Sequence, residues 1–227
     1  RDEVSLMVAS RPILQSEIRD CNQREIRFIE LPIALDALVL VTNRTNTVNN
    51  LTSQQIANIW TDHPPNVDNW TELSITNWHQ LNPAWASRHM DFFGPALTSG
   101  ASIQLRTALW DDQAHVMRND YTQLRTYPEI VSNISTNRNA LAFMSRAYFL
   151  ADTENIKALN INGNDPSAEN IQTARYPYGH YLFLYVNQDA LVNQDIDDYV
   201  HYFMAQIPVV ATRFNFVALT DDAYELY

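Results

Sequence analysis

Glycine and cysteine are scarce in this chain of 227 residues. Only four glycines occur, against a usual share of ~7%, and this excludes the glycine-rich phosphate loops of nucleotide-binding proteins. The single cysteine, Cys21, excludes an internal disulfide. The six histidines form neither an HExxH motif nor a Cys/His cluster with zinc spacing. We therefore expect no metal site and no cofactor, and we expect Cys21 to be a partly buried apolar side chain.

Positive charge and long apolar runs are also lacking. The formal net charge of -11 would be repelled by a polyphosphate backbone, and no Lys/Arg stripe offsets it. No apolar run approaches the ~20 residues of a membrane span; the most apolar windows, 33–41 and 181–186, have the length of strands. We therefore expect neither a nucleic-acid partner nor a membrane-crossing segment. With 46% hydrophobic residues, the chain can bury the core of one large domain or of two small lobes.

Short apolar runs alternate with amphipathic segments along most of the chain, which predicts an α/β protein. The predicted strands lie at 4–8, 26–30, 37–42, 90–93, 140–143, 156–161, 181–186 and 214–218. Helices are predicted at 16–24, at 52–60 after a Thr-Ser-Gln-Gln capping box, at 102–110, at 128–134 after Pro128, and at 165–174.

The segment Thr98-Ser99-Gly100-Ala101-Ser102 places two hydroxyl groups and a glycine in front of a predicted helix. A helix start has unpaired backbone N–H groups and the positive end of the macrodipole, so that an oxyanion can bind there without a lysine. The alternative is an ordinary serine N-cap without a ligand. The two interpretations differ in whether the cap's own hydrogen bonds leave donors for an anion.

Four tryptophans lie close together in the sequence, at Trp60, Trp70, Trp78 and Trp85. They could form a platform on which a sugar stacks. Spaced aromatic residues in an irregular connection such as 62–84 more often anchor the connection to the core. We expect anchoring.

The order of motifs along the chain resembles that of the phosphate-binding proteins of bacterial ABC transporters. The likeness covers nearly the whole chain, and its collinear order is more specific than any single motif. The matching segments are 8–13 (VASRPI), 29–43 (IELPIALDALVLVTN), 51–60, 76–78 (TNW), 93–95 (FGP), 98–100 (TSG), 139–143 (NALAF), 181–187 (YLFLYVN) and 216–219 (FVAL).

The resemblance implies a type II periplasmic-binding-protein fold, in which two α/β lobes close over a ligand in the interlobe cleft. The first lobe would comprise 1–36 and 180–227, and the second 37–179. The resemblance also implies the ligand contacts. Arg11 would be a charge-assisted donor, Ser10 and Ser99 hydroxyl donors, and the backbone from Gly100 to Ser102 would complete the cradle beside Thr98.

The chain departs from the family pattern at two places. Thr98 stands where the family has an acidic residue and Ala101 where it has threonine, which removes one hydrogen-bond acceptor and one hydroxyl. The strand, helix and strand that usually precede the Ser-Arg motif are missing, which leaves the first lobe incomplete at its N-terminus with an exposed apolar edge. Either the sequence is incomplete, or another chain supplies the missing strands by β-augmentation.

The resulting functional expectation is a periplasmic, extracytoplasmic solute-binding protein that holds phosphate or a related oxyanion and serves an ABC permease. The alternative is a binding-protein fold recruited as a structural or adaptor subunit of a larger assembly, with a degenerate ligand site. Aromatic residues such as Tyr199, Tyr202 and Phe203 would then be exposed for protein contacts, although their i, i+3/i+4 spacing also fits packing against the core. We expect no enzyme, because adjacent acids such as Asp197 and Asp198 point about 100° apart on a helix and cannot act on one substrate.

Overall fold

The computed structural model describes residues 4–61, 75–110 and 116–224. The chain divides into two compact units, of which the first comprises 1–36 and 179–227 and the second 37–178. Strand β2 (Phe28–Asn43) runs through the boundary and contributes to both. Within the described residues, no helix has the length and apolar character that a membrane span requires.

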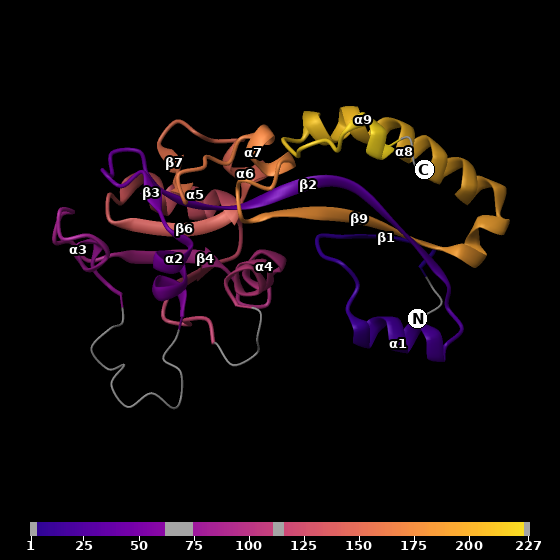
Figure 1. Ribbon diagram of the computed structural model, residues 1–227, viewed down its shortest axis with the longest axis horizontal. Coiled ribbons are helices and arrows are strands. Elements are labelled where there is room, and N and C mark those ends of the chain that lie inside the picture. The colour runs from indigo at the N-terminus through magenta and orange to yellow at the C-terminus, as the bar shows by residue number, and fades with distance from the viewer. Residues whose placement is uncertain (1–3, 62–74, 111–115, 225–227) are drawn as a thin grey trace. The chain divides into compact units, whose positions relative to one another are not determined.

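The second unit is built on a sheet formed by the later part of β2 with four further strands (Figure 1). Besides the later part of β2, the helices and strands of the second unit are, in chain order, β3 (Asn50–Leu51), α2 (Ser53–Trp60), α3 (Trp78–Leu81), β4 (Asp91–Pro95), α4 (Gly100–Leu109), β5 (Thr122–Leu124), α5 (Tyr127–Thr136), β6 (Ala140–Ser145), α6 (Arg146–Phe149), β7 (Ile156–Ala158), β8 (Asn160–Ile161) and α7 (Ala168–Gln172).

The sheet of the second unit has the order β2-β6-β4-β5, and β7 also pairs with β2. Strand β6 is antiparallel to β2, with Met144 opposite Val39, whereas β4 is parallel to both β6 and β5. The later part of β2 and nearly all of β6 are buried. Continuous burial explains why both strands read as uninterrupted apolar runs, as expected for strands covered on two faces.

Aromatic rings fill the core of the second unit. The indole of Trp60 makes edge-to-face contacts with Phe92, Tyr121 and Phe143 at ring-centroid distances of 5.7, 5.7 and 4.9 Å. Gly94 lies under the Phe143 ring, and a Cβ at this position would collide with that ring. Glycine is therefore required here for a close approach between β4 and β6.

Helix starts in the second unit agree with the capping signals in the sequence. Thr52 and Gln55 form the predicted capping box at the start of α2, since the Thr52 hydroxyl accepts the Gln55 N–H and the Gln55 side chain accepts the Thr52 N–H. Pro128 lies in the first turn of α5. These local signals predicted helix starts correctly because capping depends on residues only three positions apart.

The first unit contains the early part of β2 and a smaller set of elements. Its sheet has the order β1-β9-β2, and β1 is antiparallel to β9, with Met7 opposite Tyr185. The buried core residues are Leu31, Ile33, Leu184, Val186, Val200 and Ile207. The elements are β1 (Leu6–Ala9), α1 (Gln15–Gln23), β9 (Gly179–Asn187), the 3₁₀ helix η2 (Gln188–Val192), α8 (Gln194–Arg213) and α9 (Asp221–Tyr224).

Strand β1 is the last strand of its sheet in the described part of the chain. Its side chains Met7 and Val8 are 54% and 59% exposed. An edge strand with apolar side chains in solvent is a surface on which another strand can pair.

Four predicted strands were wrong in extent or in kind. The predictions at 26–30 and 37–42 are one strand, β2, and the prediction at 156–161 is divided into β7 and β8. No strand forms at 214–218. There α8 continues to Arg213, Asn215 follows with a positive φ of 64° that ends the helix, and Val217 makes only an isolated bridge to Leu35.

Candidate functional site

Helix α4 begins at Gly100, two residues before the predicted start at 102, and Ser99 is its N-cap, which is the alternative that the sequence left open. The Ser99 Oγ accepts the backbone N–H of Ser102 at 3.2 Å and donates to the Ser102 Oγ at 3.0 Å. The buried Ser102 hydroxyl in turn donates to the Ala96 carbonyl at 2.9 Å. Ser99 therefore closes its own helix start in this conformation, and the Ser102 side chain has a structural contact.

Two backbone donors remain at the same helix start. Gly100 and Ala101 are the first residues of α4, and no acceptor for either N–H exists among the described residues. The first turn holds no acidic side chain, and Gly100 is exposed, as is Thr98 one residue before the cap. The two N–H groups and the positive end of the helix dipole suit an oxyanion.

The loop in front of α4 is fastened to the sheet. The Tyr121 hydroxyl donates to the Pro95 carbonyl at 2.8 Å, and the Leu97 N–H donates to the Gln123 side chain at 3.1 Å. Burial raises the pKa of Tyr121, so that its hydroxyl stays protonated and remains a donor. The loop is thus held by contacts from β5 and its neighbourhood, which sequence reasoning missed because β5 is short and polar.

Ser10 and Arg11 follow directly after β1 in the first unit. The Arg11 guanidinium forms a bidentate ion pair with Glu17 at 2.7 and 2.9 Å, and its Nη1 also donates to the Pro12 carbonyl at 3.0 Å. This hydrogen bonding raises the pKa of Arg11 and lowers that of Glu17 to about 2. Glu17 occupies the Nη1/Nη2 edge of the guanidinium, which leaves the Nε/Nη2 edge as a second donor pair.

The segment after Arg11 is anchored by a tyrosine. The Tyr185 hydroxyl accepts the Ile13 N–H at 2.7 Å and donates to Glu30 at 2.6 Å. Burial and the Glu30 carboxylate raise the pKa of Tyr185. Sequence reasoning missed both Glu17 and Tyr185. The Glu17 carboxylate accepts the Leu14 N–H at 2.8 Å. This three-residue spacing is that of a helix cap, and it is a signal that could have identified Glu17.

The structure therefore brings Thr98, Ser99, Gly100 and Ser102 together at one helix start. Ser10 and Arg11 lie together at the end of β1. Within 4–61, 75–110 and 116–224, no group of three His, Cys, Asp or Glu side chains could hold a metal ion.

The tryptophans that could have formed a stacking platform anchor the fold instead. Trp60 and Trp78 are buried, and Trp85 contacts Trp78 edge to face at 6.3 Å. Trp70 lies outside the described residues. Of the aromatic residues on α8, Phe203 packs against the core of the first unit, whereas Tyr199 and Tyr202 are exposed.

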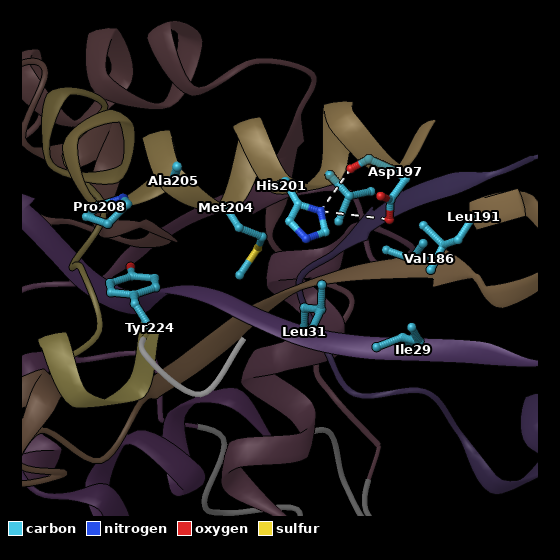
Figure 2. Close-up of a pocket in the computed structure, with 11 residues that line it drawn as sticks. Ile29, Leu31, Val186, Leu191, Asp197, His201, Met204, Ala205, Pro208 and Tyr224 are labelled. Carbon is cyan, nitrogen blue, oxygen red and sulfur yellow. Dashed lines mark hydrogen bonds and ion pairs between the residues drawn. The ribbon is translucent and has the colours of Figure 1, made fainter. Parts of the chain in front are cut away.

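A pocket of about 650 Å³ lies within the first unit, between α8 and the strands β2 and β9 (Figure 2). Ile29, Leu31 and Val186 form its floor, and Met204 projects from the helix. His201 and Asp197 are polar groups at the helix side, where the His201 Nδ1 lies 3.1 Å from the Asp197 carbonyl oxygen and 3.8 Å from the Asp197 carboxylate. This pocket is mainly apolar and offers no cluster of anion donors.

Comparison with known proteins places the chain in a family. The PBP superfamily domain matches residues 1–206, and the chain belongs to this superfamily. It is 28% identical over 228 residues to the protein SphX of Synechococcus elongatus and 21% identical over 224 residues to the phosphate-binding protein PstS of Staphylococcus saprophyticus. These matches cover 98% and 95% of this chain and 65% of each relative.

A solved structure shows the same fold. The structure of a possible phosphate binding protein from Planctomyces limnophilus matches with a TM-score of 0.74 and 21% identity, covering 99% of this chain and 79% of that one. The predicted type II periplasmic-binding-protein fold is thus confirmed, as is the resemblance to the phosphate-binding proteins of ABC transporters. The chain spans 65% of the length of the two curated relatives.

Proposed function

We propose that this chain is an extracytoplasmic solute-binding protein that holds phosphate or a related oxyanion and presents it to an ABC permease. Two of its relatives support the ligand class, one by its name as a phosphate-binding protein and one by its description as a possible one. The observation that carries the proposal is the start of α4, where two N–H groups have no acceptor and no acid lies in the first turn. We propose no catalytic role.

Ser99 supplies a third donor to the anion. Its hydroxyl donates to the Ser102 Oγ, and rotation about the Cβ–Oγ bond redirects the hydrogen to a ligand oxygen. The Ser99 Oγ keeps its capping bond from the Ser102 N–H during this rotation. An exposed Thr98 hydroxyl adjoins the same helix start.

Arg11 supplies the positive charge, with Ser10 beside it. Its Nε/Nη2 edge can make a bidentate contact to an oxyanion while Glu17 holds the other edge. Because Glu17 stays ionised, it fixes the guanidinium plane before the ligand arrives. An arginine held in this way loses less conformational entropy when it binds.

The absence of an acid at Thr98 bears on which anion is preferred. A protonated phosphate can donate a hydrogen bond to a carboxylate in the site. Sulfate has no proton to donate, so a carboxylate there disfavours its binding. With threonine at this position, we expect the affinities for phosphate and sulfate to lie within about tenfold of each other.

The role of α4 is tested at Gly100, the first residue of the helix. Gly100→Pro removes the N–H donor but suits the first helical position, and Ser99 already has the extended backbone (φ -70°, ψ 155°) that a following proline requires. We expect Gly100→Pro to weaken phosphate binding by at least about tenfold. Gly100→Ala, which keeps the N–H, should bind like the unchanged protein. Equal affinity in both variants, at unchanged helix content, would contradict the α4 assignment.

A second candidate function is that of a subunit completed by another chain. The observations that favour it are the exposed Met7 and Val8 on the edge strand β1 and the apolar pocket of the same unit (Figure 2). A strand added to β1 by β-augmentation would cover this edge. Light scattering of the purified protein tests the idea. A stable monomer whose state is unchanged in Val8→Lys counts against an obligate subunit.

A further inference from the structure

A small pocket of about 90 Å³ lies in the second unit, apart from the start of α4. Its lining includes Asn46, Trp78, Trp85, Arg88, Arg138 and Asn139. A water molecule occupies about 30 Å³ in the liquid, so the pocket has room for about three waters or for an organic molecule of a few heavy atoms.

Two of these residues carry a buried polar atom that has no hydrogen-bond partner among the described residues, namely the Trp78 Nε1 and the Asn139 Oδ1. Trp78 is only 3% exposed. Buried polar groups are almost always hydrogen-bonded, and the exceptions call for a missing water or ligand. The neighbouring Asn46 amide is directed elsewhere, since it donates to the Arg138 carbonyl and accepts the Val48 N–H. One donor and one acceptor are therefore left open.

Two guanidinium groups border the same pocket. Neither Arg88 nor Arg138 has a carboxylate partner in the described part of the chain, and the one side-chain contact of Arg138 is a 3.5 Å approach to the Thr45 carbonyl. Two arginines at one pocket without a described carboxylate partner are notable in a chain with a net charge of -11. Guanidinium groups recognise carboxylates and other oxyanions.

The walls of the pocket distinguish between these anions. Val48, Ala86 and the two indole rings, which meet edge to face, are apolar. An inorganic oxyanion such as phosphate has no apolar surface to place against such walls, whereas a small organic acid does.

We propose that this pocket binds a small hydroxycarboxylate of two or three carbon atoms. The carboxylate contacts Arg88 and Arg138. The hydroxyl group accepts a hydrogen bond from Trp78 and donates one to Asn139, so that one ligand group satisfies both open atoms. This site uses none of the residues assigned to the oxyanion and stands independently of the function proposed above.

The proposal is tested by titrating the full chain with glycolate and with acetate, followed by calorimetry and by tryptophan fluorescence, which reports on Trp78 and Trp85. We expect glycolate to bind with a dissociation constant on the order of 1 mM or tighter. Acetate, which lacks the hydroxyl, should bind about tenfold more weakly.

Variants locate the site. Arg138→Met should weaken glycolate binding by about tenfold or more, and Asn139→Leu should abolish the preference for glycolate over acetate. Arg175→Met serves as the matched control, because Arg175 is an exposed arginine of the same unit that does not line the pocket. Arg11→Met should leave the glycolate titration unchanged and affect phosphate alone.

Several outcomes would overturn the proposal. One is the absence of glycolate binding in a folded protein that still binds phosphate. Another is glycolate binding that disappears in Arg11→Met but persists in Arg138→Met, which would assign glycolate to the oxyanion site. A third is phosphate binding that disappears in Arg138→Met. A crystal structure grown with glycolate in which waters alone bond Trp78 and Asn139 would also contradict it.

Discussion

The two units of this chain differ in how completely they bury their apolar side chains. The largest fully buried side chains, including Trp60, Phe143 and Tyr176, all lie in the second unit. Eleven of the fifteen exposed large hydrophobic side chains among the described residues lie in the first unit: Val4, Met7, Val8, Leu14, Tyr181, Val192, Tyr199, Tyr202, Val209, Val210 and Phe214.

The difference indicates that the second unit has a complete core, whereas the first offers apolar surface that a further polypeptide can cover. The difference in packing also affects how the groups proposed to bind the oxyanion are held. The start of α4 rests on the well-packed sheet of the second unit, while Arg11 is held mainly by polar contacts to Glu17 and by the anchoring of its segment through Tyr185.

Two methionines on strands provide the sharpest test of this comparison. Met144 on β6 is fully buried and Met7 on β1 is 54% exposed. Met144→Ala should lower the free energy of unfolding by about 2–5 kcal/mol, because it leaves a cavity. Met7→Ala should change it by no more than about 0.5 kcal/mol. Chemical denaturation measures both. Comparable losses in the two variants would mean that Met7 is covered in solution.

Gly94 tests how tightly the second unit is packed. A methyl group at this position would collide with the Phe143 ring, so Gly94→Ala should cost about 1–3 kcal/mol of stability. A double variant with Phe143→Leu, which shortens the opposing side chain, should recover part of this loss. Wild-type stability in Gly94→Ala alone would show that the ring moves aside freely.

Glu17 tests whether polar contacts order the Arg11 segment. Its pKa is lowered to about 2 in the folded protein from 4.5, so its contribution to stability is present above pH 4.5 and is lost as the pH falls through about 2. Because both side chains are partly exposed, we expect less than about 1 kcal/mol. Glu17→Gln should remove this part of the acid dependence, which denaturation between pH 5 and pH 2 measures.

If the unfolding free energy of Glu17→Gln shows the same acid dependence as that of the unchanged protein, the ion pair does not form in solution. Glu129→Gln is a suitable control, because Glu129 caps a helix in the second unit without an arginine partner.

Local sequence signals predicted the helix starts better than the strands. The Thr52 capping box and the Ser99 cap follow from residues three positions apart, so no tertiary information is needed to find them. Strand β2 was predicted as two strands, at 26–30 and 37–42, whereas it runs without a break through Pro32, a residue that ordinarily argues against a continuous strand. Its continuity depends on pairing with β6 and β9, which are distant in sequence.

The candidate site was predictable in part. Helix α4 and the position of Arg11 after β1 follow from the sequence pattern. The Glu17 ion pair and the self-closing hydrogen bond from Ser99 to Ser102 do not, because they depend on side-chain geometry. The partners of the Arg88 and Arg138 pocket come together from three segments separated in sequence, which no motif links.

We propose that this chain binds an oxyanion and that Arg11 and the start of α4 each contribute to the binding. Calorimetric titration of the purified protein with phosphate, with sulfate as a second anion and Arg11→Met and Arg19→Met as matched variants, tests it most directly. The account predicts micromolar or tighter binding of phosphate that is lost in Arg11→Met and retained in Arg19→Met. A folded protein that gives no heat with either anion, or binds phosphate equally well without Arg11, would contradict it.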